Sequence, residues 1–235
     1  MNLSLYSAAA GARAQQGKLD VISNNLANLH TDGYKSQIAG FVDLLYENYE
    51  KGVTRDPDTG CGVRHEKTDF LFESGGLQET GMKYDYAIVD EGFFAVYNPE
   101  DGEIYYTRNG SFHLSNFGQD VFYLADQNNN LVLSKDMGLI LVDTNKDEPL
   151  DIGIFDFAHK EGFLAQGNNY YQPVQKNGNP IVLGDQPKQG WVEMANVDMA
   201  AEMTRVIETQ RAYQIVLKMV QTTDEIEQNI NSLRR

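Results

Sequence analysis

Apolar residues recur at steps of three and four near both ends of the chain, and this pattern constrains the fold more than any other feature. The first run comprises Leu5, Ala8, Ala12, Gln15, Leu19, Ile22, Leu26 and Leu29. Such spacing is typical of one face of an α-helix and, when sustained, of a coiled coil. Alanine, leucine and glutamine dominate its first half and favour helix. We predict that this helix ends near Thr31–Gly33, because glycine suits a C-terminal cap.

The C-terminal end carries a matching pattern, and no proline or glycine follows Gly190. One run comprises Met199, Met203, Val206, Gln210, Tyr213, Leu217 and Val220, and an offset run comprises Val216, Met219, Thr223, Ile226, Ile230 and Leu233. The offset indicates that the apolar seam drifts around a nearly straight helix. We predict a helix from about Val197 to Ser232, which would be ~50 Å long at ~1.5 Å per residue.

The middle of the chain has the character of β-structure. Short runs of β-branched and aromatic residues occur at Tyr86–Val89, Phe93–Tyr97 and Ile104–Thr107. Turn signals separate them, such as Pro99–Gly102 and Asn128–Asn130. All six prolines lie between Gly33 and Gly190. These features predict a compact domain of many short antiparallel strands from Gly75 to about Gln189.

The sequence therefore predicts an α+β protein in which an all-β domain is inserted between two long terminal helices that pack as a coiled-coil-like pair. The expected divisions are an N-terminal helix of an assembly core (1–35), a linker and connecting segment (36–74), a β-rich outer domain (75–190) and a C-terminal helix of the assembly core (191–235). An isolated amphipathic helix needs tertiary packing. We expect the helices to pack on each other and then on other copies; a self-contained helical hairpin is the alternative.

Charge excludes several classes of partner. The chain has 34 acidic and 19 basic residues, a formal net charge of −15, which argues against nucleic acid and anionic lipid as ligands. The two ends are nearly neutral and the middle carries the negative charge, so the ends can pack against other copies without large repulsion. No apolar run approaches the ~20 residues that cross a bilayer. We find no cleavable secretory signal at the N-terminus, which indicates either a cytoplasmic protein or export without cleavage.

The sequence contains no convincing catalytic or metal-binding motif. The Asp143–Asp147 segment begins like an EF-hand loop, but Glu148 and Ile154 stand where that loop requires glycine and glutamate. The lone cysteine, Cys61, cannot form an intrachain disulfide, and the four histidines are scattered. We therefore expect that the protein is not an enzyme and that it has no catalytic residue, no metal and no cofactor. The segment from Leu45 to Phe72 is harder to interpret: its sequence begins with helical character, and Thr54–Gly60 within it is typical of a loop.

Three segments resemble signature sequences of the flagellar rod and hook family. The first is Leu19–Asn28 followed by Thr31–Lys35, which resembles an Asn-Asn-hydrophobic-Ala-Asn stretch closed by Thr-x-Gly-Tyr/Phe-Lys. The second comprises Thr80-Gly81, Asp85, Ala87-Ile88, Gly92–Phe94, Tyr106–Phe112 and Gly118. The third comprises Glu193–Asp198, Glu202-Met203 and Gln210–Tyr213. The length and the Phe41–Tyr46 stretch resemble proximal or distal rod proteins more than the longer hook proteins, and both rod types stay open.

The resemblance implies a structural subunit of the bacterial flagellar rod that polymerises helically and transmits torque from the basal body to the hook. Terminal helices would form an inner tube and β domains an outer wall. The implied partners are copies of the chain, other axial proteins of the rod and hook, and the flagellar type III export apparatus, which cleaves no signal. No nucleic acid or small-molecule substrate is expected. A hook-type axial protein, a secreted adhesin with helical stalks and a β-rich hydrolase are the alternatives.

We expect subunit contacts on both terminal helices. Three asparagines three and four residues apart should share one side of the first helix, and arginine suits subunit contacts because of its forked donors. The expected interface residues are Leu19, Ile22, Asn24, Asn25, Leu26, Asn28, Leu29, Met203, Val206, Gln210, Arg211, Tyr213, Leu217 and Val220. If the helices need partners, limited proteolysis of the monomer should trim both ends and leave a core from about Phe41 to Gly190.

Overall fold

The computed structural model describes residues 3–44, 62–116, 121–142 and 150–233. The chain forms two compact units. The helical unit comprises Met1–Ala27, Gln37–Asp69 and Asp198–Arg235, and the β unit comprises Asn28–Ser36 and Phe70–Val197. The sequence-based interpretations of Thr54–Gly60, Cys61 and Asp143–Asp147 fall outside the described residues, as does Gly118.

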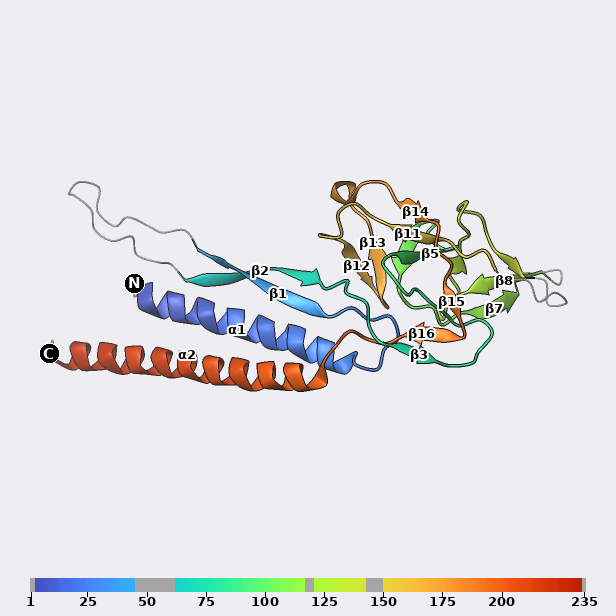
Figure 1. Cartoon of the computed structure of the whole chain (residues 1–235). Coiled ribbons are helices and arrows are strands. Elements are labelled where there is room, and N and C mark those ends of the chain that lie inside the picture. Colours follow the sequence, from blue (N-terminus) through green and yellow to red (C-terminus); the bar gives the residue numbers. More distant parts are fainter. Residues whose placement is uncertain (1–2, 45–61, 117–120, 143–149, 234–235) are drawn as a thin grey trace. The chain divides into compact units, whose positions relative to one another are not determined.

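The helical unit has three layers, as Figure 1 shows: a two-stranded sheet, then helix α1, then helix α2. The helices are α1 (Leu3–Ala27) and α2 (Met199–Leu233), and the strands are β1 (Gln37–Asp43) and β2 (Val63–Phe70). The helices run antiparallel, because Asn25 bonds to Glu202 while Gly11 approaches Val216. The C-terminal helix was predicted within two residues at each end, and this prediction is confirmed.

The end of the first helix was predicted wrongly. α1 ends at Ala27 rather than near Thr31–Gly33. A turn follows, in which the Thr31 N–H donates to the Asn28 carbonyl oxygen at 3.1 Å. Gly33 has a positive φ of 67° but belongs to the β unit, where its N–H donates to the Glu193 carbonyl oxygen at 2.7 Å. The glycine thus serves a tertiary contact rather than a helix cap.

The β unit is built around a ten-stranded antiparallel sheet with the main strand order β10-β8-β9-β5-β6-β13-β12. Strand β11 pairs with β5 and β14, and β7 pairs with β8. The strands are β5 (Phe93–Tyr97), β6 (Ile104–Thr107), β7 (His113–Asn116), β8 (Phe122–Ala125), β9 (Leu131–Val132), β10 (Leu141–Val142), β11 (Ile154–Asp156), β12 (Leu164–Gly167), β13 (Tyr170–Gln172) and β14 (Ile181–Leu183). A 3₁₀ turn, η1, spans Gln175–Asn177.

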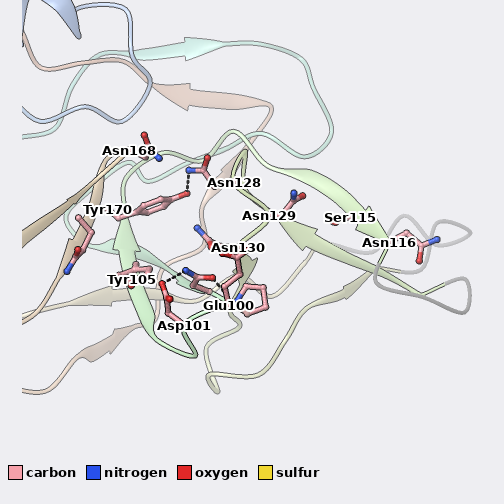
Figure 2. A pocket seen from close by; sticks show the side chains of 13 residues that line it. Glu100, Asp101, Tyr105, Ser115, Asn116, Asn128, Asn129, Asn130, Asn168 and Tyr170 are labelled. Atoms are coloured by element: carbon pink, nitrogen blue, oxygen red, sulfur yellow. Dashed lines mark hydrogen bonds between the residues drawn. The ribbon is translucent and has the colours of Figure 1, made fainter.

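Each of two smaller sheets pairs a strand that precedes β5 in the sequence with a strand that follows β14. One pairs β3 (Leu77–Glu79) with β16 (Trp191–Glu193), and the other pairs β4 (Tyr86–Ala87) with β15 (Lys188–Gln189). The predicted antiparallel β-structure is therefore confirmed, as is the α+β class. Turns also lie where predicted: Asn129, in the Asn128–Asn130 turn of Figure 2, has a φ of 61°.

Strand β5 is buried on both faces and divides the core in two. Its alternate residues Phe94 and Val96 join an aliphatic cluster with Leu124, Val132 and Ile152. The intervening residues Phe93 and Ala95 join an aromatic cluster that includes Tyr106, Phe155, Phe157, Phe163 and Tyr171. Side chains alternate between the faces of a strand, so a strand covered on both faces is apolar throughout. This explains the unbroken Phe93–Tyr97 run.

The segment expected to be a linker, 36–74, contributes strands β1 and β2. The sequence signal for β2 was weak because the strand carries five charged or histidine residues, Arg64, His65, Glu66, Lys67 and Asp69. His65 packs instead against α1, where its ring lies near Gly17, and against Phe41, whose ring centroid is 5.8 Å away. Among the described residues, no helix is long and apolar enough to cross a membrane, and no cluster of metal-ligating side chains occurs.

Candidate assembly interface and motif cluster

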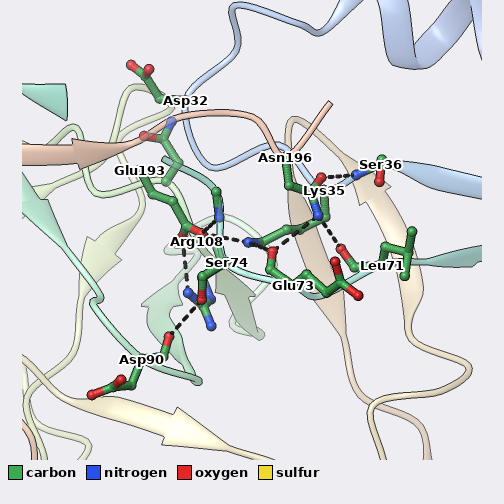
Figure 3. Close-up of polar contacts among 12 residues, drawn as sticks. Asp32, Lys35, Ser36, Leu71, Glu73, Ser74, Asp90, Arg108, Glu193 and Asn196 are labelled. Atoms are coloured by element: carbon green, nitrogen blue, oxygen red, sulfur yellow. Dashed lines mark hydrogen bonds and ion pairs between the residues drawn. The ribbon is translucent and has the colours of Figure 1, made fainter. Parts of the chain in front are cut away.

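A buried ionic cluster in the β unit joins one residue from each of the three signature segments (Figure 3). The Glu193 carboxylate accepts from Lys35 Nζ at 2.7 Å and from the Arg108 guanidinium at 3.1 Å. All three residues are at most 1 % exposed. These residues are 85 and 158 positions apart from Glu193 in sequence. The signature segments therefore converge in space, which the sequence did not reveal.

Backbone groups complete the coordination of these charges. Lys35 Nζ also donates to the Glu73 carbonyl oxygen at 2.7 Å, and the Gly75 N–H donates to Glu193 Oε1 at 2.7 Å. Beside them, the Asn196 amide accepts from the Ser36 N–H at 2.6 Å and donates to the carbonyl oxygens of Leu71 and Glu73. These bonds hold the Asn28–Ser36 segment in the β unit.

Two glycines of the signature segments allow the backbones to approach. A Cβ atom on Gly33 would lie 2.4 Å from the Asn109 nitrogen, and one on Gly110 would lie 1.6 Å from the Tyr86 carbonyl oxygen. No side chain fits at such distances, so both positions require glycine.

The cluster holds two cations and one anion. Burial lowers the pKa of Lys35 below its ordinary value, the Glu193 carboxylate opposes this shift, and the Arg108 charge adds to it. Arg108 lies over the Phe93 ring, 5.7 Å from its centroid, and its Nε has no hydrogen-bond partner among the described residues. Among the described residues, Glu193 is therefore the one anion that pairs with both of these buried cations.

The predicted interface residues divide into three groups by burial, and two of them, Asn28 and Leu29, lie beyond the end of α1. Ile22 and Asn25 are buried within the chain, at 4 % and 1 % exposure. Leu19, Leu26, Asn28, Leu29, Val206, Tyr213 and Val220 are partly buried. Asn24, Met203, Gln210, Arg211 and Leu217 are exposed. The set is thus not one continuous surface.

Asn25 has an intrachain role that sequence reasoning missed. Its side-chain oxygen accepts from the Gln37 N–H at 2.8 Å, and its amide donates to the Gln37 carbonyl oxygen at 2.9 Å and to Glu202 Oε1 at 3.4 Å. Glu202, only 2 % exposed, also accepts from Arg205 at 2.6 Å. This polar contact ties α1 to both β1 and α2. Asn25 and Glu202 lie in the first and third signature segments, and this was the available clue.

Helix α2 buries one face and exposes apolar residues on the rest. The covered face comprises Glu202, Val206, Thr209, Tyr213, Val216, Val220 and Thr223. The exposed apolar residues are Met199, Met203, Ile207, Ile215, Leu217, Met219, Ile226, Ile230 and Leu233, all at least 40 % exposed. So many exposed apolar side chains on one element mark an interaction surface.

Helix α2 also extends beyond α1. The Asn25–Glu202 and Gly11–Val216 contacts fit one antiparallel register, which brings Leu3 level with Asp224. The following turns of α2, through Leu233, therefore lie past the first described residue of α1 (Figure 1). Ile226, Ile230 and Leu233 on this overhang are 58 %, 56 % and 87 % exposed.

Comparison with known proteins finds matches in three regions of the chain. Three family models match the chain: flagella basal body rod protein at residues 5–35, flagellar hook protein FlgE/F/G D1 domain at 87–148, and flagellar basal body rod FlgEFG protein C-terminal at 188–233. Each of the three buried-cluster residues lies inside one of these matched ranges.

Full-length relatives extend the similarity to the whole chain. The flagellar basal-body rod protein FlgG of Buchnera aphidicola subsp. Schizaphis graminum is 35% identical over 258 residues, covering 98% of this chain and 99% of the relative. FlgG of Borreliella burgdorferi is 32% identical over 266 residues, covering 100% of both. The flagellar basal-body rod protein FlgF of Mesorhizobium japonicum is 28% identical over 242 residues, covering 95% of this chain and 94% of the relative. The chain therefore belongs to the flagellar basal-body rod protein family.

Proposed function

We propose that this chain is a non-enzymatic structural subunit of the flagellar rod, that it polymerises helically through α1 and α2, and that the polymer transmits torque to the hook. In this proposal the helical unit forms the assembly core and the β unit the outer part. Its partners are copies of itself and other axial proteins, and it reaches the basal body through the flagellar export apparatus without cleavage of a signal. The observation that carries the proposal is the exposed apolar surface of α2.

The overhang of α2 supports contact between copies. Ile226, Ile230 and Leu233 are spaced at i, i+4 and i+7, so they form one apolar stripe of about two turns. The opposite end of α2 exposes a second set, Met199, Met203 and Ile207. A stripe at one end that binds a different patch at the other end of the next copy makes a head-to-tail contact. Such a contact generates a helical filament when the rotation from one copy to the next does not close into a ring.

The two sets also lie on different flanks of α2. At ~100° per residue, Met199, Met203 and Ile207 fall on one side of the face that covers α1, whereas Ile226, Ile230 and Leu233 fall on the other side. One helix can therefore contact two neighbours at once, as a helical tube requires. We further propose that α1 and α2 pair as in a coiled coil and that this pair supports the contact.

Of the residues predicted from sequence as subunit contacts, the exposed members fit this role best. Met203 and Leu217 lie among the exposed apolar residues of α2, and Gln210 and Arg211 lie between them in sequence. Ile22 and Asn25 act indirectly in this proposal, because they hold α1 in place beneath α2. The higher identity to proteins named FlgG than to the one named FlgF supports a place in the rod like that of FlgG.

The test is incorporation of a subunit with a polar overhang. The Ile226→Asp/Ile230→Asp double variant should remain folded but fail to restore rods and swimming in cells that lack the natural gene. Gln228→Asp/Asn229→Asp is the matched control, because it places the same charges on exposed polar positions of the same turns. Circular dichroism of the purified chains checks folding, and electron microscopy of isolated basal bodies reports assembly.

The outcomes separate clearly. Rods that end early with the double variant and continue normally with the control support the proposal. Normal rods containing the double variant would show that the overhang makes no subunit contact. Deletion of the gene gives the coarser test, since basal bodies should then end early and lack hooks and filaments.

A further inference from the structure

The β unit has an open hollow of about 800 Å³ that the rod function does not use (Figure 2). Three turns form it: the β5–β6 turn at Asn98–Asp101, the β8–β9 turn at Asn128–Asn130, and the β12–β13 turn at Gln166–Tyr170. The end of β7 and Tyr105 of β6 complete the lining. Figure 2 shows the side chains of Tyr105 and Tyr170 along one side of it.

A buried carboxylate holds the lining in one arrangement. Asp126, 5 % exposed, accepts from the N–H groups of Asn128 and Asn130, both at 2.9 Å, and from the Asn130 amide at 3.2 Å. The Tyr170 hydroxyl donates to the same carboxylate and accepts from the Asn128 amide at 2.8 Å. The network joins two of the three turns and fixes them relative to each other. Burial and the adjacent Asp126 raise the pKa of Tyr170, which keeps its hydroxyl protonated as a donor.

The chemistry of the lining excludes most ligand classes. Seven side-chain amides, two carboxylates, two phenols, one hydroxyl and one proline line the hollow. None of these described lining residues is Lys, Arg or His, so an anionic ligand would find no countercharge. An apolar ligand would find little more than Pro99 and two tyrosine rings. No group of three His, Cys, Asp or Glu side chains that could hold a metal ion occurs among the described residues.

A neutral polyhydroxyl ligand fits what remains. An amide side chain both donates and accepts hydrogen bonds, as a sugar hydroxyl does. Tyr105 and Tyr170, whose ring centroids are 5.9 Å apart, add two aromatic rings to the lining, and such rings can pack against the C–H side of a sugar. The carboxylates of Glu100 and Asp101 can accept from hydroxyl groups, and Asp101 also accepts from the Asn98 amide at 2.9 Å. We propose that this hollow binds a neutral saccharide chain.

Nuclear magnetic resonance of the full-length, isotope-labelled chain tests the proposal. The probes are maltotetraose, cellotetraose and the tetramer of N-acetylglucosamine, with tetralysine as a cationic comparison. At least one saccharide should shift the resonances of the three turns, with a dissociation constant of millimolar order. The Asn129→Gly/Asn168→Gly double variant should weaken binding about tenfold, because it removes two amides. Both positions have a positive φ, which glycine adopts without strain.

Asn169→Gly is the matched control. Asn169 also has a positive φ, of 62°, and lies in the same turn as Asn168, but its amide donates to the Asp32 carbonyl oxygen and does not line the hollow. Its saccharide affinity should therefore equal that of the natural chain. If the double variant is unfolded, Asn168→Gly alone takes its place, with an expected loss of about threefold.

Two results would overturn the proposal. One is the absence of any saccharide-induced shift up to about 50 mM, far above a millimolar dissociation constant. The other is a response of the three turns to tetralysine that Glu100→Gln abolishes, with no response to the saccharides; the hollow would then bind a basic segment. The experiment uses the isolated chain, so its outcome is independent of whether the chain assembles into rods.

Discussion

Replacement of Glu193 by glutamine should destabilise the β unit far more than a change of one side-chain atom suggests. The glutamine oxygen can still accept from Lys35 and the Gly75 N–H at the position of Oε1. Its NH₂ group would then face the Arg108 guanidinium, which now lies 3.1 Å from Glu193 Oε2. Two donors would meet, and two cations would remain buried without an anion.

The expected magnitude follows from the burial of the cluster. Removal of one partner from a buried ion pair costs about 3–5 kcal/mol, because the remaining charge stays desolvated. Arg108→Met leaves Lys35 and Glu193 as a balanced pair, retains most of the apolar stem, and removes a buried Nε that has no partner among the described residues. We expect this second change to cost only about 1–2 kcal/mol, mainly for the lost hydrogen bond. Whether Glu193→Gln lowers the free energy of unfolding more than Arg108→Met therefore tests whether one anion balances two cations in the cluster.

Urea denaturation followed by tryptophan fluorescence measures both values. The chain has a single tryptophan, Trp191, and it lies in the β unit two residues from Glu193. The signal therefore reports the unit in which the cluster lies, without interference from the helical unit. If Arg108→Met destabilises the β unit as much as Glu193→Gln, loss of the anion costs no more stability than loss of one cation. Our reasoning about the electrostatics of the cluster would then be wrong.

Three further predictions concern the backbone, the charge and the limits of the β unit. Gly110→Ala should destabilise it by about 4 kcal/mol or more in urea denaturation, since a Cβ would overlap a carbonyl oxygen, whereas Gly184→Ala, with open space around it, should be nearly neutral. Asp32→Asn should raise the melting temperature at pH 7 but not at pH 3. Burial and a neighbouring aspartate raise the pKa of Asp32, so the natural chain loses stability as pH rises through that pKa. Below the unfolded-state pKa of 3.8 the Asp32 carboxyl is protonated, so the side chain at position 32 is uncharged in both proteins. A fragment of residues 28–197 should give dispersed amide resonances, whereas 41–190, the core first expected from sequence, should not; a folded 41–190 fragment would show that the cluster is dispensable.

Periodicity in the sequence determined which parts of the chain are helix and which are strand. The C-terminal helix and the strands at Phe93–Tyr97 and Ile104–Thr107 were predicted within about two residues. Hydrophobic spacing is a local property, since it depends only on residues that are close together in the sequence. The three signature segments likewise indicated the family, which the comparisons confirm.

Tertiary structure decided what the signature residues do. Lys35, Arg108 and Glu193 were conspicuous only as members of separate motifs, and their pairing depends on how segments far apart in sequence come together. The same holds for Asn25, which bonds to Gln37 and Glu202 within the chain. A local sequence pattern does not indicate which distant group will pair with a buried charge or form a hydrogen bond with a buried amide.

The ends of the helices and their inward faces were also decided by tertiary contacts. The first helix stops at Ala27 because the following residues bond to the β unit, and Gly33 is required by the backbone of Asn109 rather than by a helix cap. On α2 the sequence shows apolar residues around most of the circumference. Only the packed structure separates the side that covers α1 from the side left exposed, because burial is a property of the partner as well as of the residue.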